Sequence, residues 1–129
     1  MSKSPITCHV LDVSIGRPAE GVEVTLQVYH KGPGGIDVFN PLARGVTDGD
    51  GRCSRLLPPR NSAEAKETGQ EFRAGIYKII FKPTDYFEKI GRKCFYPWVE
   101  ITFDIENPDE HYHIPLLISP YSYVTYRGS

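Results

Sequence analysis

The stretch VEVTLQVY, residues 22–29, alternates apolar and polar side chains with a period of two. Successive side chains of a strand point to opposite faces, so this pattern is typical of a strand with one buried face. The stretch VEITFDIE, residues 99–106, repeats the pattern. Two such segments, far apart in the chain, predict a core built between β-sheets.

Further strand-like segments surround these two. They are short, rich in β-branched and aromatic residues, and separated by clusters of glycine, proline and aspartate that favour turns; they span residues 6–13, 52–56, 75–81, 111–118 and 121–126. The polar residues 58–73 are expected to form a long surface loop. Seven to eight short strands at this spacing predict an all-β fold, a β-sandwich.

One short helix is expected near the middle of the second half of the chain. Thr84 or Asp85 can cap its start, and Gly91 can end it. Phe87 and Ile90 would share one face of this helix. The expected architecture is therefore a β-sandwich with one short helix.

Length and composition bound the possible functions. With 129 residues, 40% of them hydrophobic and 24% charged, the chain is expected to form a single domain over residues 1–129. A formal charge of −1 gives no electrostatic reason to expect binding to nucleic acid or an anionic membrane. No apolar run approaches the roughly 18 residues of a membrane span, no secretory signal is visible, and the C-terminal tripeptide is not of the SKL type. The cytoplasm is the expected compartment, with the peroxisome as the alternative.

The three cysteines, Cys8, Cys53 and Cys94, form no CxxC pair. Neither a zinc site nor a disulfide framework is therefore indicated. We expect buried or half-buried free thiols.

Strand alternation places polar side chains where a bland surface would be expected. If Val10 faces the core, its neighbour His9 faces away from the core. In the same way, if Ile114 faces the core, His113 faces away from it. Tyr126 would lie on the same outward face. The outer face of one sheet is therefore expected to collect two histidines and a tyrosine.

Each of these residues also has a simpler explanation. A strand histidine is usually a solvated surface residue, Arg52 could be a charged turn residue, and Tyr126 an ordinary strand aromatic. His111 and His113 could be half of a metal site, although no further ligand stands at a recognisable spacing. A GxSxG elbow, a P-loop and a dinucleotide fingerprint are all missing from the sequence, so covalent nucleophilic catalysis is not indicated.

Longer motifs, taken together, resemble a known family. They run in order along nearly the whole chain: HVLDVSIGRPAEGVEVTL (9–26), TDGDGR (47–52), GIYKIIFKPTDYF (75–87), FYPWVEITFDI (95–105) and HYHIPLLISPYSYVTYRGS (111–129). The chain resembles the 5-hydroxyisourate hydrolase family, the transthyretin-related enzymes of urate breakdown. The middle motifs are shared with transthyretin, a hormone carrier of the same fold. His9, Arg52, His113 and the terminal Tyr-Arg-Gly-Ser resemble the enzyme, whereas Val124 replaces a residue that is usually small and polar.

The resemblance implies a transthyretin-like β-sandwich assembled as a homotetramer, a dimer of dimers, with active sites opening into a channel between the dimers. It implies hydrolysis of the lactam of 5-hydroxyisourate, a small-molecule substrate, to 2-oxo-4-hydroxy-4-carboxy-5-ureidoimidazoline. No metal or organic cofactor is implied. A carrier that binds a small ligand without turnover is the main alternative, and a scaffolding sandwich without a ligand is the other.

The resemblance also assigns residues. His9, Arg52 and His113 are the implied catalytic residues, with the division of labour between the histidines open. The implied substrate-binding residues are His9, Arg52, Tyr126, Arg127, Gly128 and Ser129. Arg127 could instead fix the terminal segment by an ion pair, and Ser129 would offer its hydroxyl and its carboxylate. A neutral histidine suits activation of water near neutral pH, and an arginine fork suits an oxygen-rich ring.

Overall fold

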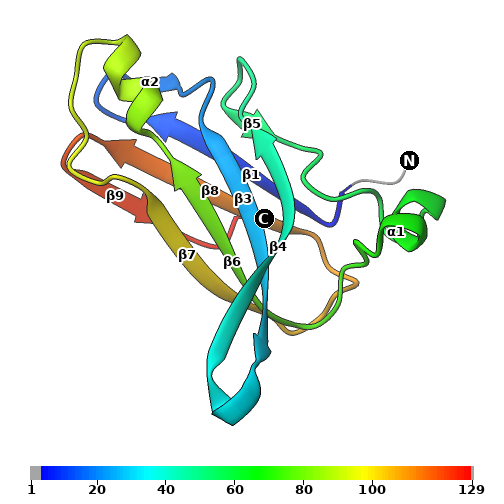
Figure 1. Cartoon of the computed structure of the whole chain (residues 1–129). Helices are drawn as coiled ribbons and strands as arrows, with labels where there is room; N and C mark the ends of the chain where they lie inside the picture. Colours follow the sequence, from blue (N-terminus) through cyan, green and yellow to red (C-terminus); the bar gives the residue numbers. More distant parts are fainter. Residues whose placement is uncertain (1–3, 129) are drawn as a thin grey trace.

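The computed structural model describes residues 4–128, which form two β-sheets packed face to face (Figure 1). One sheet has the order β4-β3-β6-β7 and contains β3 (Glu23–Lys31), β4 (Asp37–Val46), β6 (Gly75–Lys82) and β7 (Val99–Ile105). The other has the order β2-β1-β8-β9 and contains β1 (Ile6–Asp12), β2 (Arg17–Pro18), β8 (Tyr112–Ser119) and β9 (Ser122–Thr125), with β5 (Arg52–Cys53) also pairing with β1. The predicted all-β sandwich is confirmed.

The pairing of β1 with β8 positions the candidate site. These two strands are parallel and come from opposite ends of the chain, with Thr7 beside His113 in the register. The short strand β5 pairs with β1 in antiparallel orientation, so that Arg52 lies beside His9. Residues from the beginning, the middle and the end of the sequence therefore meet on one sheet.

The core lies between the sheets and takes every second residue of the strands. Strand β1 alternates strictly between buried and half-buried residues, from Ile6 to Asp12. The same alternation in the other strands joins buried residues of both sheets into one hydrophobic cluster, including Val10, Val24, Leu26, Ile79, Phe81, Ile114 and Leu116. No helix among the described residues is long and apolar enough to cross a membrane.

The expected helix exists as α2 (Thr84–Lys89), but the prediction of its cap was wrong. Pro83 occupies the N-cap position and has no polar side-chain atom that could cap the helix, and the hydroxyl of Thr84 donates to the carbonyl of Pro97 at 3.1 Å. Asp85 lies in the first turn of the helix. Gly91 has a φ of 72° just beyond the helix, so the predicted end is confirmed.

The predicted shared face of Phe87 and Ile90 was also wrong. Phe87 is fully buried, whereas Ile90 is 40% exposed. Ile90 occupies the C-cap position with non-helical dihedral angles, so its side chain leaves the helical face.

Three further differences concern element boundaries. Strand β4 was not predicted, and the expected loop 58–73 contains a helix, α1 (Ala63–Thr68). The expected strand 52–56 is only the two-residue β5. The described residues thus form nine strands and two α-helices, with a 3₁₀ turn η1 (Pro33–Gly35), where seven to eight strands and one helix were expected.

Candidate active site

Two histidine rings lie together on the outer face of the β1–β8 sheet. His9 comes from β1 and His113 from β8, and their ring centroids are 6.3 Å apart with planes tilted by 34°. Both side chains are half-buried, and their neighbours Cys8, Val10, Tyr112 and Ile114 are buried in the core. Strand alternation therefore predicted the face of both histidines correctly.

A tight turn brings Arg52 to His9. The carboxylate of Asp48 accepts hydrogen bonds from the backbone N–H groups of Asp50 at 2.9 Å and Arg52 at 3.0 Å. Gly51 has a φ of 74°, and a Cβ at this position would lie 2.4 Å from the carbonyl oxygen of Val10. Only glycine allows this turn to lie against β1. The side chain of Arg52 is exposed beside that of its register partner His9.

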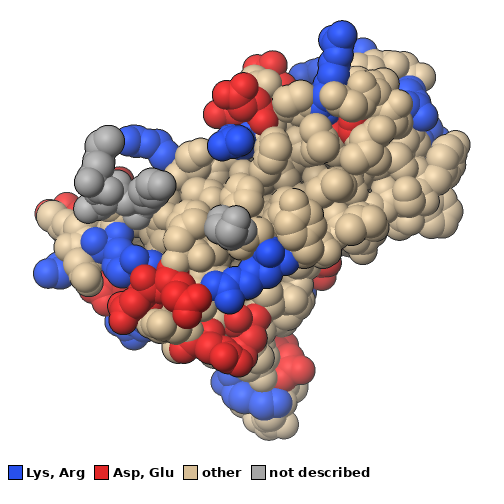
Figure 2. Space-filling model, turned by 180° about the vertical axis from the view of Figure 1, so that it is seen from behind, with Lys and Arg blue, Asp and Glu red and all other residues tan. Residues whose placement is uncertain are grey.

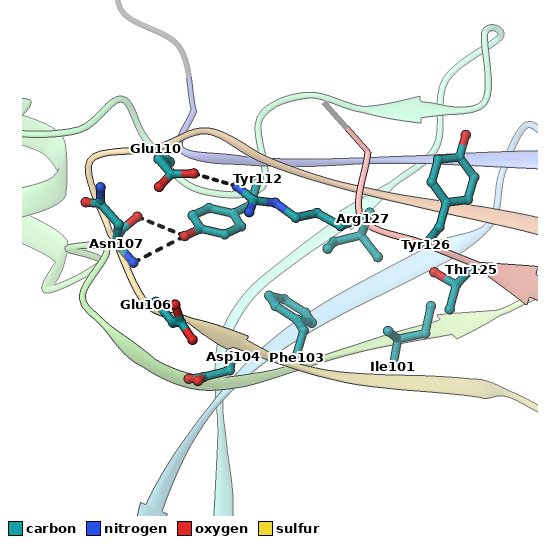
Figure 3. Close-up of a pocket in the computed structure, with 11 residues that line it drawn as sticks. Ile101, Phe103, Asp104, Glu106, Asn107, Glu110, Tyr112, Thr125, Tyr126 and Arg127 are labelled. Carbon is teal, nitrogen blue, oxygen red and sulfur yellow. Dashed lines mark hydrogen bonds and ion pairs between the residues drawn. The ribbon is translucent and has the colours of Figure 1, made fainter.

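The segment after β9 returns to His113. The backbone N–H of Gly128 donates to the carbonyl oxygen of His113 at 2.8 Å, and a Cβ at Gly128 would lie 2.8 Å from Cδ2 of the His113 ring. Tyr126 is 58% exposed, and Figure 3 shows its ring pointing away from Ile101 and Phe103 of β7. The predicted site residue Ser129 lies outside the described residues.

Arg127 points the other way. Its guanidinium pairs with the carboxylate of Glu110 at 2.8 Å and lies 4.4 Å from the ring centroid of Tyr112 (Figure 3). Tyr112 lies on the face of β8 opposite to His113. The structure therefore does not bring Arg127 to the two histidines, and it makes the ion pair that the sequence left as an alternative.

Arg127 belongs to a cleft between the open edges of the two sheets. This cleft has a volume of about 750 Å³ and is lined by residues of β7, the β7–β8 loop, β8 and the segment after β9. Its floor is apolar, with Ile101 and Phe103, and its rim carries Asp104, Glu106 and Glu110. We call it the edge cleft.

The surroundings of His113 disfavour its charged form. Burial lowers the pKa of His113 below the ordinary 6.5, and the positive charges of His9, His111 and Arg52 lower it further. None of these causes is a carboxylate. The ring of His113 is therefore neutral at neutral pH, which is the protonation state that a general base requires.

Sequence reasoning missed Thr7. Its Oγ1 lies 2.7 Å from Nδ1 of His113 and 3.1 Å from Nε2 of His111, so that one hydroxyl joins two histidines. Alternation along β1 places Thr7 on the same face as His9. The contact with His113 depends on the parallel pairing of β1 with β8, which no local pattern in the sequence reveals.

The described part of the chain offers no metal site and no disulfide. Within residues 4–128, no group of three or more histidine, cysteine, aspartate or glutamate side chains is arranged to hold a metal ion. Cys8, Cys53 and Cys94 are free thiols, the first two buried and the third half-buried, as expected.

The sandwich of two four-stranded β-sheet paths, β4-β3-β6-β7 and β2-β1-β8-β9, places the protein in the transthyretin-like fold class, as its match to a solved transthyretin structure shows. The model of the HIUase/Transthyretin family matches residues 6–128, and the chain belongs to this family.

Individual relatives show the same similarity. The mouse protein named 5-hydroxyisourate hydrolase is 38% identical over 126 residues, covering 98% of this chain and 96% of the mouse protein. The structure of Klebsiella pneumoniae 5-hydroxyisourate hydrolase matches with a TM-score of 0.73 and 32% identity over the full length of both chains. Sea bream transthyretin in complex with thyroxine matches with a TM-score of 0.77 and 30% identity, covering 97% of this chain and 95% of that chain.

Proposed function

We propose that this protein hydrolyses 5-hydroxyisourate, opening its lactam ring to give 2-oxo-4-hydroxy-4-carboxy-5-ureidoimidazoline in urate degradation. The observation that carries the proposal is the pair of histidine rings 6.3 Å apart, next to Arg52, with no carboxylate among the described residues 4–128 paired with His113. The names of relatives that share 32–38% of the sequence support the same substrate.

The arrangement suits attack of water on a cyclic amide. The reaction needs a base for the water, donors for the developing oxyanion and a proton for the leaving nitrogen. His9 and His113 supply the base and the acid between them. The lowered pKa of His113 favours its neutral form, and the exposed guanidinium of Arg52 offers donors to the oxygens of the substrate. Removing such a donor typically costs about 3–4 kcal/mol of transition-state stabilisation.

The segment after β9 would form one wall of the site. Gly128 lets the backbone touch His113, and the exposed ring of Tyr126 would hold the substrate by its hydroxyl or its face. Ser129 stays a predicted binding residue that follows directly. Arg127 would act mainly by fixing this segment through Glu110.

We further propose that the whole chain, residues 1–129, is one hydrolase domain that assembles as a homotetramer, with the histidine face lining a channel between dimers. An apolar row crosses this face next to the histidines, because Leu11 pairs with Leu117 and Leu117 with Val124 in the strand registers. Val124 is 60% exposed. Figure 2 shows a broad area without charged residues beside an end where charges gather. Exposed apolar residues such as Val124 on an uncharged surface are typical of an interface. The cytoplasm remains the predicted compartment.

A carrier without turnover is the second candidate, because a transthyretin structure in complex with thyroxine matches nearly the whole chain. A carrier would need the apolar row for ligand contact but would have no use for two histidines beside an arginine. It predicts saturable binding of an aromatic ligand and no effect on the decay of 5-hydroxyisourate.

The test is the decay of fresh 5-hydroxyisourate, generated from urate by uricase and followed by its ultraviolet absorbance. We expect the wild-type protein to accelerate the decay manyfold, and His9→Ala and Arg52→Ala each to remove most of the acceleration. His30→Ala, on the exposed end of β3, serves as the matched control and should retain it. Decay at the spontaneous rate with folded wild-type protein would exclude the proposed activity and favour the carrier.

A further inference from the structure

The side chain of Thr7 stands between two histidines and contacts no other described side chain in the hydrogen-bond network of this face. Its Oγ1 lies 2.7 Å from Nδ1 of His113 and 3.1 Å from Nε2 of His111. A hydroxyl carries one proton and accepts through its lone pairs. Thr7 therefore donates to one ring nitrogen and accepts from the N–H of the other when both rings are neutral, so the tautomers of the two rings are coupled.

The coupling allows two arrangements. In the first, Nδ1–H of His113 donates to Thr7, whose hydroxyl donates to Nε2 of His111, and Nε2 of His113 is left with a free lone pair. In the second, both hydrogen bonds are reversed: Nε2–H of His111 donates to Thr7, Thr7 donates to Nδ1 of His113, and Nε2 of His113 carries the proton. Only the first arrangement gives His113 a nitrogen that can take a proton from water.

We propose that Thr7 is a positioning residue for the hydrolysis, and that, with His111 as its acceptor, it holds His113 in the tautomer whose Nε2 is a general base. The catalytic role of Thr7 rests on the proposed function, whereas its effect on the tautomer of His113 rests on its two contacts with the histidine rings. It adds to the implied catalytic residues two side chains that act through His113.

The hydrolysis requires no proton transfer along His113, Thr7 and His111. As the water oxygen bonds to the lactam carbonyl carbon, Nε2 of His113 takes a proton from the water and the carbonyl oxygen becomes the oxyanion. The imidazolium keeps its Nδ1–H bond to Thr7, and Thr7 keeps its proton toward His111. When the ring C–N bond breaks, Nε2 returns its proton to the leaving nitrogen. A partner on the second nitrogen fixes ring orientation and tautomer, as in other histidine-based sites.

The acid limb of the pH–rate profile is expected to come from His113. Burial and the positive charges of its neighbours lower the pKa of this ring, and its protonation at low pH removes the lone pair of Nε2 that the general base needs. The charged and titratable groups around the pair are His9 on β1, Arg52 on β5 and, next to His111, Glu110 with its partner Arg127, and Arg60, which donates to the carbonyl of Glu110 at 2.8 Å. Of the groups near His111, Arg127 lowers the pKa of Glu110, so this carboxylate stays charged near neutral pH.

The test compares Thr7→Val, which keeps the shape of the side chain without its hydroxyl, with Thr7→Ser, which restores the hydroxyl. We expect kcat for 5-hydroxyisourate to fall roughly 10- to 100-fold in Thr7→Val, with KM changed much less. This is the range typical for removal of a group that orients a metal-binding histidine, and we expect a similar loss for a catalytic one. Thr7→Ser should recover most of kcat. Thr102→Val, the same change on an exposed position of β7, is the matched control. Full activity in Thr7→Val, or a Thr7→Ser variant as impaired as Thr7→Val, would overturn the inference.

Two readouts separate the positioning role from mere structure. His111→Gln, whose amide oxygen can still accept from Thr7, should keep most of kcat, whereas His111→Leu, which offers no acceptor, should lower kcat about as much as Thr7→Val; equal effects of the two variants would indicate a purely structural role. Nitrogen-15 NMR of the histidine rings should show His113 of the wild type with its proton on Nδ1, and Thr7→Val should shift it toward Nε2. An Nε2–H ring in the wild type at pH 8 would refute the assignment even in an active enzyme.

The NMR readout also separates this inference from the proposed function. If the wild-type protein leaves 5-hydroxyisourate at its spontaneous rate, the hydrolase proposal fails, while the tautomer of His113 still reports whether Thr7 positions it. If the wild-type protein is active and His113 carries its proton on Nε2, the hydrolase proposal stands and only the role of Thr7 is lost.

Discussion

Polar side chains lie on both sides of β8, but the charges of the groups around them differ. On the outer face, His113 is surrounded by His9, His111 and Arg52, all of them groups that are or can become positive, and its pKa is lowered. On the inner side, at the edge cleft, Arg127 meets the carboxylate of Glu110 and the ring of Tyr112. Among the described residues, no carboxylate forms an ion pair with the polar groups of the outer face, whereas at the edge cleft the carboxylate of Glu110 pairs with Arg127.

This difference separates chemistry from anchoring. A group that must bind an anionic or oxygen-rich substrate gains from having no carboxylate of the protein as competitor. A group that must hold a chain segment in place gains from a fixed partner. The two roles are divided between neighbouring residues of one segment, because Gly128 touches His113 while Arg127 reaches the edge cleft.

The largest expected effect follows from comparing the two arginines. Arg52→Ala should lower kcat/KM for 5-hydroxyisourate by roughly 10²- to 10³-fold, because its guanidinium is exposed, forms no ion pair within residues 4–128 and can therefore bind the developing oxyanion. Arg127→Ala should lower it much less, through a looser terminal segment. Steady-state kinetics of both variants beside the wild-type protein measures the ratio. Equal losses would mean that both arginines bind substrate and that the comparison of the two faces is wrong.

A second, smaller effect is expected from Gly128→Ala. The added Cβ would lie 2.8 Å from Cδ2 and 3.1 Å from the carbonyl oxygen of His113, so the segment must shift away from the ring. We expect kcat/KM to fall roughly 10- to 100-fold, as when a supporting group at a histidine site is lost, with little change in the midpoint of thermal unfolding. Gly49→Ala is the matched control, since its Cβ meets nothing within 4 Å. If both variants are fully active, the terminal segment does not form a wall of the site.

Strand alternation predicted the positions of the two histidines, whereas the position of Arg127 differs from what the family resemblance implied. It placed His9 and His113 on one outer face, because the buried Val10 and Ile114 fixed the parity of two regular strands. The same alternation applied to residues 126–128 separates Arg127 from Tyr126. The family resemblance had grouped Arg127 with the substrate-binding residues, whereas the structure sends it to the edge cleft.

Other parts of the fold lacked a pattern that local reasoning could detect. Strand β4 reads DVFNPLARGV, without a regular alternation, and its pairing with β3 shifts register between Leu26 and Gln27, opposite Pro41 and Ala43. Helix α1 is only six residues long and buries one of them, Ala65, although the cap at Ser62 and the left-handed Gly69 were signals for it. The contact of Thr7 with His113 needed the neighbour of β1 to be known, and sheet order is a property of the whole chain.

A third prediction addresses the edge cleft alone. Glu110→Gln should lower the midpoint of thermal unfolding slightly at low salt and leave kcat/KM within about 2- to 3-fold of the wild type, because the pair of Glu110 with Arg127 is exposed and is screened by salt. Calorimetry at two salt concentrations, together with the decay of 5-hydroxyisourate, checks both parts. A large loss of activity would place the edge cleft, and not only the outer face, in the function of the protein.

The smallest expected effect concerns the pH dependence of the free energy of unfolding, to which the two faces contribute in different pH ranges. The pKa of His113 is lowered from 6.5 by burial and by its positive neighbours, so the unfolded chain binds a proton here more readily than the folded one. The contribution of His113 to stability is therefore complete above pH 6.5 and is lost as the pH falls toward its folded pKa. The pKa of Glu110 is lowered from 4.5 by Arg127, so its contribution is lost only as the pH falls below about that value. Denaturant unfolding between pH 8 and pH 4 should show a first decline that His113→Gln flattens and a second that Glu110→Gln flattens. A single decline that neither variant changes would show that the two faces of β8 do not differ electrostatically in the way their contacts indicate.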